Sequence, residues 1–344
     1  MLANHPYLLL KLNRLLKNHS VKCMGVLVAD KLGMRHLSVR IDPFVGCNLR
    51  CRMCHFSSPE FYGRKSEILA MDDYSRIARL LFRKAVQVVL GTGAEPTLHP
   101  HLPKLVEIAK QEYGVPFVSI SSNAQLLTMD LATKLIAAGL DEYTISTHGV
   151  HQDTYERLQP PATFEKLHRA FANLTELAKA GSHKFSVRVN FTVNPDNHAE
   201  LGEFFDVFGG YKIDTLQIRK VFDVDGAAYA DRDLSRFETS LEATRLKLLE
   251  ECRKRGTTLL CPSFQTKPEA PNPQAAILLP LVYRYASPSM VWREDFDWRH
   301  ESYEVFCKRI HWHRRLVSMA FTRAAILARD IQDANRSLGY EVGS

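Results

Sequence analysis

Three cysteines with the spacing C-x3-C-x2-C, at Cys47, Cys51 and Cys54, restrict this chain more than any other feature of its sequence. Thiolates are the usual ligands of iron–sulfur clusters, and three of them on one short loop can hold three irons of a [4Fe-4S] cube while the fourth iron stays open. A structural zinc site is usually closed by four ligands, and His55, directly beside Cys54, is badly placed to complete a tetrahedron. The spacing therefore favours a cluster with one open iron over zinc.

The composition fits a metal protein of a reducing compartment. Seven cysteines in 344 residues, three of them within eight positions, argue against a disulfide framework. The sequence has no apolar run of about 18 residues, and Lys11, Arg14 and Lys17 interrupt the apolar stretch near its N-terminus before any secretory cleavage pattern. We therefore expect a cytoplasmic protein with no membrane partner. The net charge of +7 permits an anionic substrate but selects none.

One strand pattern precedes the cysteine motif, and helix and strand patterns alternate after it. Strands are expected at residues 36–42, 86–90, 115–121, 142–146, 185–193 and 215–221, and helices at 72–81, 102–113, 129–138, 164–180 and 199–208. This alternation implies parallel strands joined by right-handed crossovers. The fold class is therefore α/β, and we expect a partial (β/α)6 barrel, with an open doubly wound sheet as the other possibility.

The chain divides into three expected parts: a leader at residues 1–35, a core domain at 36–255 and a C-terminal extension at 256–344. The composition of the extension changes along the chain from Pro-rich to aromatic and charged. We expect the extension to pack on the barrel and cover its mouth. In both candidate folds ligands sit at the carboxyl ends of the strands. The chemical motifs follow the first four expected strands, so they should meet at one edge of the sheet.

The cysteine motif, preceded by a strand and followed at once by His55, resembles the signature of the radical S-adenosylmethionine (SAM) superfamily. The resemblance covers residues 37–221 and implies two cofactors, a [4Fe-4S] cluster and SAM. It implies that the open iron binds the amino and carboxylate groups of SAM. It also implies an electron donor such as flavodoxin or ferredoxin as a partner. The reduced cluster would then split SAM into methionine and a 5′-deoxyadenosyl radical.

A second motif, from Gly91 to Pro96, is similar to the Gly-Gly-Glu-Pro loop of the same family. The resemblance implies that the Gly93 backbone and the Glu95 carboxylate receive the SAM ammonium group, since glycine permits close approach and a carboxylate accepts charge-assisted hydrogen bonds. Ala94 stands where the family has its second glycine, which puts the local backbone angles in doubt. The alternative is an ordinary Gly-rich turn with a capping Glu.

Three further side chains are matched to SAM by position. Ser122 and Asn123 end the third expected strand, where relatives often carry a pair that touches the SAM ribose, although both are also common turn residues. Arg188 lies on the polar face of a strictly alternating strand and is a candidate for the SAM carboxylate; the alternative is a buried ion pair. On the last strand Ile218 is a weaker candidate for the adenine, with Gln217 and Arg219 facing the other way.

The function expected from these motifs is hydrogen abstraction from a substrate by the deoxyadenosyl radical. A peptide or a small molecule is favoured, because the basic and aromatic run at residues 308–315 is a weak signal for nucleic-acid binding. Modification of tRNA or another RNA is the alternative within the enzyme class. The alternative outside the enzyme class is a non-catalytic iron–sulfur sensor or binding protein. A sensor would not need Glu95 as an acceptor for the SAM ammonium group. The motifs identify no catalytic residue beyond the cofactor contacts.

Cys252, Cys261 and Cys307 lie outside the core motifs. Some radical SAM families carry a second cluster in a C-terminal extension, but they use closely spaced cysteines, which this extension lacks. We therefore expect free thiols, which behave as small apolar side chains.

Overall fold

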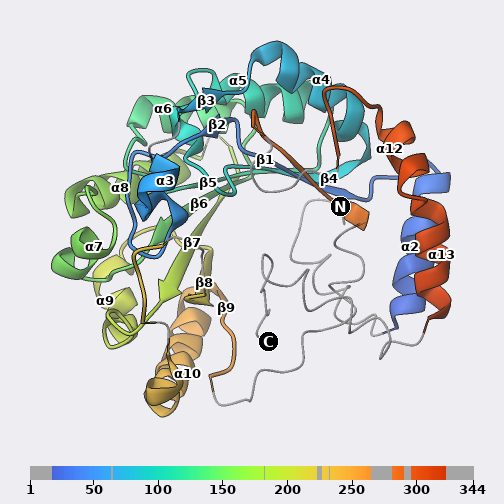
Figure 1. Cartoon of the computed structure of the whole chain (residues 1–344). Coiled ribbons are helices and arrows are strands. Elements are labelled where there is room, and N and C mark those ends of the chain that lie inside the picture. The colour runs from blue at the N-terminus through green and yellow to red at the C-terminus, as the bar shows by residue number, and fades with distance from the viewer. Residues whose placement is uncertain are drawn as a thin grey trace.

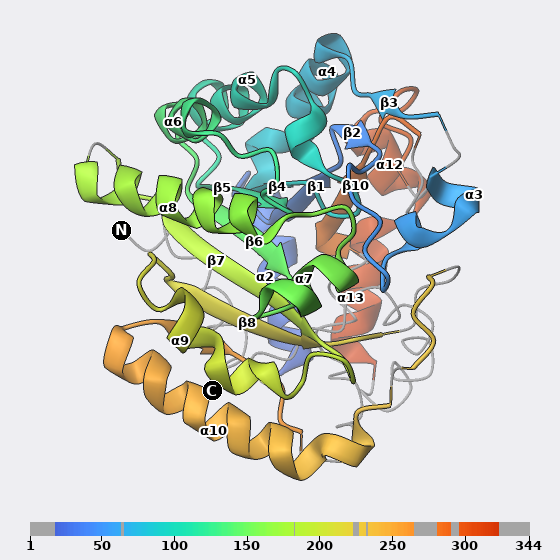
Figure 2. The same cartoon turned by 90° about the vertical axis from the view of Figure 1, so that its left-hand side faces the viewer.

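The computed structural model describes residues 18–62, 65–181, 183–222, 227–231, 233–264, 281–289 and 296–322. In this part of the chain, eight parallel strands form one curved sheet in the order β10-β1-β4-β5-β6-β7-β8-β9. Helices α4, α5, α6 and α8 cover its convex face (Figures 1 and 2). The concave face is called the lumen below. This architecture confirms the expected partial barrel.

The bounds of the elements are as follows. The strands are β1 (Leu37–Ile41), β2 (Phe44–Val45), β3 (Glu67–Ile68), β4 (Ala85–Leu90), β5 (Phe117–Ser122), β6 (Glu142–Thr147), β7 (Ser186–Val193), β8 (Thr215–Lys220), β9 (Thr258–Leu260) and β10 (Tyr283–Ala286). The α-helices are α2 (His19–Lys31), α3 (Pro59–Tyr62), α4 (Met71–Leu81), α5 (Leu102–Glu107), α6 (Met129–Ala137), α7 (Gln152–Leu158), α8 (Phe164–Ala180), α9 (Phe204–Phe208), α10 (Glu238–Arg255), α12 (Tyr303–Arg309) and α13 (Trp312–Phe321).

The six central strands begin and end within two residues of their expected bounds. Two of the expected helices are less regular than the periodicity indicates. The helix at 102–113 continues from α5 into a π-helical turn, η5 (Ile108–Glu112), and the helix at 199–208 is a 3-10 turn, η6 (Glu200–Glu203), followed by the short α9. Apolar periodicity locates the buried face of a helix but does not fix its hydrogen-bonding pattern.

The C-terminal extension contributes strands to the same sheet. β9 pairs with β8 at one edge, and β10 pairs with β1 at the other, both parallel. Helix α13 then packs along α2, so the two ends of the described chain lie side by side (Figure 1). Most of the Pro-rich segment lies outside the described residues, as do residues 1–17 of the leader and residues 323–344 of the extension. The division at residues 35 and 255 stays a prediction.

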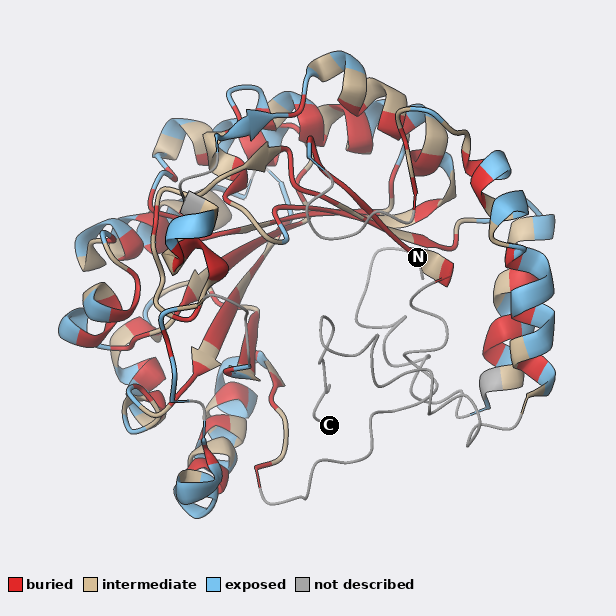
Figure 3. Ribbon diagram, viewed as in Figure 1, coloured by how far each residue is buried: buried red, intermediate tan, exposed pale blue. Residues whose placement is uncertain are grey.

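The core lies between the sheet and its helices, as the burial pattern in Figure 3 shows. On β7 the side chains of Val187, Val189, Phe191 and Val193 are fully buried in this layer. The alternating residues of the strand face the lumen, as the alternation predicts. Among the helices that the structure describes, none combines the length and the apolarity needed to cross a bilayer.

Phe191 tests the importance of this layer. Its side chain is 0% exposed in the middle of the sheet, so Phe191→Ala should lower the free energy of unfolding by about 3–5 kcal/mol through lost burial and a residual cavity. The matched control is Phe321→Ala on α13, because Phe321 is 81% exposed and its loss should change stability by less than about 0.5 kcal/mol. Chemical denaturation under anaerobic conditions measures both, and equal effects would contradict this placement of the core.

Candidate cofactor site

The three cysteines occupy one tight loop at the carboxyl end of β1. The loop is fastened to the segment after α7, because the Arg50 amide donates to the Pro160 carbonyl (2.6 Å) and the Arg52 amide to the Leu158 carbonyl (3.0 Å). Within the loop, the Cys54 amide donates to the Cys51 carbonyl (2.9 Å). Backbone contacts thus hold the loop in place independently of any ligand on the thiols.

The thiols influence one another electrostatically. Burial, followed by the Glu95 carboxylate and Cys54, raises the pKa of Cys47 to about 12. Burial, then Cys54 and Cys47, raise the pKa of Cys51, and burial raises that of Cys54. Such thiols need a positive charge to become thiolates, and metal ions provide it. Three neighbouring, partly buried thiols on one loop therefore fit an iron cluster.

The geometry does not favour the zinc alternative. Within the described ranges, no three His, Cys, Asp or Glu side chains stand close enough to share one metal ion, whereas the thiols of a cubane each bind a different iron. The His55 ring lies among Phe56 and Phe61, with centroids 4.4 and 5.0 Å away, and burial lowers its pKa to about 4. His55 is thus part of the aromatic packing behind the loop.

The Gly-rich loop after β4 is held by a buried carboxylate that the sequence motifs did not include. Asp42, fully buried after β1, accepts the backbone N–H groups of Thr92 (2.5 Å) and Gly93 (3.1 Å) and the hydroxyl of Tyr285 (2.7 Å). Burial raises the pKa of Asp42, and these hydrogen bonds counter part of that rise. Gly91 has φ +81°, and a Cβ there would stand 2.5 Å from the Ser121 carbonyl oxygen, so this turn requires glycine.

Glu95 points into the protein and joins two loops. One carboxylate oxygen accepts the Ser122 hydroxyl (2.7 Å) and the Thr97 amide (3.1 Å) and hydroxyl (2.5 Å), and the other accepts the Asn123 amide (2.8 Å). The capping role considered above is therefore present, since Glu95 caps the 3-10 turn η4 (Pro96–Leu98). Its predicted contact with the SAM ammonium stays a prediction, as does the predicted ammonium contact of Gly93.

Asn123 reaches the cysteine loop. Its side-chain N–H group donates to Asn48 Oδ1 (2.8 Å) and to Cys47 Sγ (3.7 Å), and its Oδ1 accepts the Gln125 amide (3.0 Å). The ribose contacts of Ser122 and Asn123 stay predictions. The structure brings Cys47, Glu95, Ser122 and Asn123 into one continuous network at the carboxyl ends of β1, β4 and β5.

Arg188 lies in the lumen near the start of β7. Its guanidinium forms an ion pair with Glu142 (2.9 Å) and donates to Gln217 Oε1 (3.2 Å), so the buried ion pair considered as the alternative is formed. A SAM carboxylate contact for Arg188 stays a prediction. Ile218 is not in the lumen: it pairs with Phe191, is 2% exposed and belongs to the core under the helices. The expectation was wrong because it assigned the two faces of β8 the wrong way round.

The weaker sequence features have mainly structural roles. Cys252 and Cys261 are buried, Cys307 is partly buried, and all three are free thiols. In the basic run, the Trp312 ring is buried, with its Nε1–H bonded to the Leu281 carbonyl (2.9 Å), so it does not provide a stacking surface. Arg309 forms an ion pair with Glu301 (2.6 Å).

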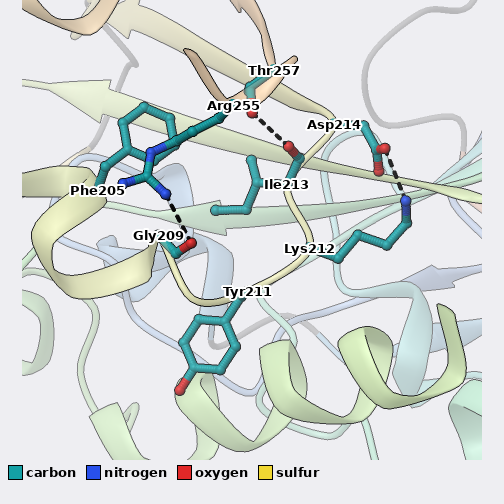
Figure 4. A pocket seen from close by; sticks show the side chains of 8 residues that line it. All are labelled: Phe205, Gly209, Tyr211, Lys212, Ile213, Asp214, Arg255 and Thr257. Carbon is teal, nitrogen blue, oxygen red and sulfur yellow. Dashed lines mark hydrogen bonds and ion pairs between the residues drawn. The ribbon is translucent and has the colours of Figure 1, made fainter. Parts of the chain in front are cut away.

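A hollow of about 360 Å³ lies at the opposite end of the sheet, beside the start of β8 (Figure 4). Its charged groups bond within the protein: Lys212 pairs with Asp214 (2.9 Å), and Arg255 donates to the Gly209 carbonyl (3.0 Å). Because ligands in such folds bind at the carboxyl ends of the strands, this hollow is separate from the cofactor site.

A partial barrel with a three-thiol loop after its first strand defines the chain as an iron–sulfur protein of α/β architecture. Residues 41–207 match the family model described as the Radical SAM superfamily. These residues form a radical SAM domain, so the chain is a radical SAM enzyme, and the cofactors of this family are a [4Fe-4S] cluster and SAM.

Curated relatives are similar over most of the chain. A protein of Saccharolobus solfataricus named "Probable GTP 3′,8-cyclase" is 28% identical over 223 residues, which are 64% of this chain and 69% of the relative. A protein of the same name from Saccharolobus islandicus is 26% identical over 262 residues, 75% of this chain and 78% of the relative.

Solved structures show the same fold at low identity. SuiB of Streptococcus suis bound to S-adenosylmethionine has a TM-score of 0.57 at 18% identity; the match covers 74% of this chain but only 58% of SuiB, less than two thirds. The structure of anSMEcpe with bound AdoMet and the Cp18Cys peptide has a TM-score of 0.57 at 14% identity, and the match covers 83% of this chain and 84% of that one.

Sequence reasoning missed three residues of the site. Asp42 had a signal, since it ends the first expected strand, at the edge of the sheet where the other motifs gather. Tyr285 had none, because it lies on a strand that follows a Pro-rich segment. Gln159 follows α7, a helix that was not among the expected ones.

The network around Glu95 can be tested without cofactors. Both carboxylate oxygens of Glu95 accept hydrogen bonds from protein donors. In Glu95→Gln one of these oxygens becomes an NH2 group, which would face a donor instead of an acceptor. The metal-free protein should lose about 1–3 kcal/mol of unfolding free energy. Glu304→Gln, at an exposed position on α12, is the matched control and should be neutral. A Glu95→Gln protein as stable as the wild type would show that Glu95 has no structural role.

The Asp42 contact gives a second prediction. Tyr285→Phe removes one donor from a buried carboxylate and should cost about 1.5–3 kcal/mol, the value of a hydrogen bond to a charged group. The loop at Thr92 and Gly93 should loosen, so SAM affinity, measured by equilibrium dialysis, should fall while iron content stays unchanged. Tyr113→Phe, which does not touch Asp42, is the control. Unchanged stability and affinity in Tyr285→Phe would contradict the prediction.

Proposed function

We propose that this enzyme cleaves SAM reductively at the three-cysteine loop and passes the resulting radical to a small anionic substrate by hydrogen abstraction. The observation that carries the proposal is the continuous network of Cys47, Asn123, Glu95 and Ser122 at one end of the sheet. A sensor needs a cluster ligand set but not a Gly-rich loop fastened beside it.

When bound and reduced, the cluster supplies the electron that splits SAM into methionine and a 5′-deoxyadenosyl radical, which takes a hydrogen atom from the substrate. The chain's own residues bind and orient. Cys47, Cys51 and Cys54 would hold the cluster. Asp42 fixes the loop at Gly93 by binding its amide, and a fixed loop can present a backbone carbonyl group to an ammonium group.

The charge of the lumen supports an anionic substrate. Arg40 on β1, Arg188 on β7 and Arg219 on β8 lie on the sheet face opposite the fully buried core side chains, and Glu142 is ion-paired with Arg188. Guanidinium groups that face a concave surface attract anions. The name of the curated relatives, "Probable GTP 3′,8-cyclase", points to the same class of substrate.

The proposal predicts deoxyadenosine formation. Protein reconstituted anaerobically with iron and sulfide, then reduced with dithionite in the presence of SAM, should release 5′-deoxyadenosine, detected by chromatography. A variant with Cys47, Cys51 and Cys54 all replaced by Ala should release none. A wild-type protein that holds a [4Fe-4S] cluster, yields no deoxyadenosine and shows no change in its EPR spectrum with SAM would refute the radical role.

The substrate class is tested in the same assay. GTP should increase the yield of deoxyadenosine and itself be consumed, whereas an unrelated peptide should not. The opposite result would favour a peptide substrate over a nucleotide, as in the complexes of SuiB with the precursor peptide SuiA and of anSMEcpe with the Cp18Cys peptide.

A further inference from the structure

Two buried carboxamide side chains approach two of the three cysteine thiols. Asn123, on the turn after β5, has its Oδ1 bonded to the Gln125 amide (3.0 Å). That bond fixes which way the amide group faces. Its N–H groups therefore point to Asn48 Oδ1 (2.8 Å) and Cys47 Sγ (3.7 Å).

Gln159 repeats this arrangement on the neighbouring loop. It follows α7 and is 1% exposed. Its Oε1 accepts the His148 amide (2.7 Å), so its Nε2 faces the opposite side, where it meets the Ser146 carbonyl (3.5 Å). The same carboxamide lowers the pKa of the Cys51 thiol, against the larger rise that burial causes. Both carboxamides are thus oriented by a backbone N–H so that only a donor faces sulfur.

We propose that Asn123 and Gln159 are positioning residues that raise the reduction potential of the cluster by donating hydrogen bonds to Cys47 and Cys51. The inference rests on the cluster of the proposed function and adds residues that control how easily it accepts an electron. For Asn123 this role is separate from the predicted ribose contact.

The negative charge that the ligand sulfurs gain on reduction is the physical reason for this effect on the potential. Reduction adds one electron and no proton, so the ligand sulfurs become more negative. N–H groups already aimed at two sulfurs stabilise that state more than the oxidised one, and hydrogen bonds to sulfur are one of the factors that set cluster potentials. Because backbone contacts hold both amides in place, little reorganisation is needed when the electron arrives.

The experiment measures potential rather than turnover. Gln159→Met and Asn123→Leu keep side-chain size and remove the donors. Each reconstituted variant should show a more negative midpoint in an EPR-monitored redox titration without SAM, with reduction about tenfold less favourable, or about 59 mV for a one-electron couple. Because the two residues contact different sulfurs, the shifts should add in the double variant.

Asn173→Leu is the matched control. Asn173 is also a carboxamide that donates to a backbone carbonyl, that of Leu127 (3.2 Å), but on α8, so its loss should leave the potential unchanged. If either Gln159→Met or Asn123→Leu binds a full complement of iron and keeps the wild-type potential, the inference is wrong for that residue. A wild-type protein that binds no cluster would instead refute the proposed function.

Discussion

The site depends on two carboxylates, Asp42 and Glu95, buried at the carboxyl ends of neighbouring strands. Each is surrounded by N–H and O–H donors from other segments: the Gly-rich loop and β10 for Asp42, and the end of β5 for Glu95. A buried carboxylate is costly unless such donors surround it. Once they do, each donor segment is fixed to the same point, and the loops beside the cysteines acquire a defined geometry before any cofactor binds.

Parallel topology explains why residues far apart in sequence meet here. Every crossover returns the chain to the same end of the sheet, so the loops after β1, β4, β5 and β6 are neighbours in space. Cys47, Glu95, Asn123 and Gln159 come from these four loops or the segments that follow them. A contact between residues 47 and 123 therefore requires no long excursion of the chain.

Much of this arrangement could be predicted from the sequence, but not the internal bonding of the site. Short apolar runs between helical patterns located the six central strands, because strands of a parallel sheet are buried and short. The sequence pattern could not decide which face of β8 meets the lumen, and Ile218 was placed wrongly. The sequence pattern also could not assign hydrogen-bond donors and acceptors. Glu95 was expected to face a ligand, yet both its oxygens accept hydrogen bonds from protein donors. Such pairings depend on loops, whose contacts are not periodic in sequence.

The role of the C-terminal extension in the sheet could not be predicted from the sequence either. Its Pro-rich composition suggests an appendage, yet β10 completes one edge of the sheet and carries Tyr285 to Asp42. The adjacent Arg284 is fully buried, with its guanidinium 4.4 Å from the Phe306 ring centroid and bonded to the Leu281 carbonyl (3.0 Å). β10 is thereby held against α12 on one side while it supports the Gly-rich loop on the other. Since Asp42 would otherwise lack one of its donors, the extension is part of the structure that orients this loop.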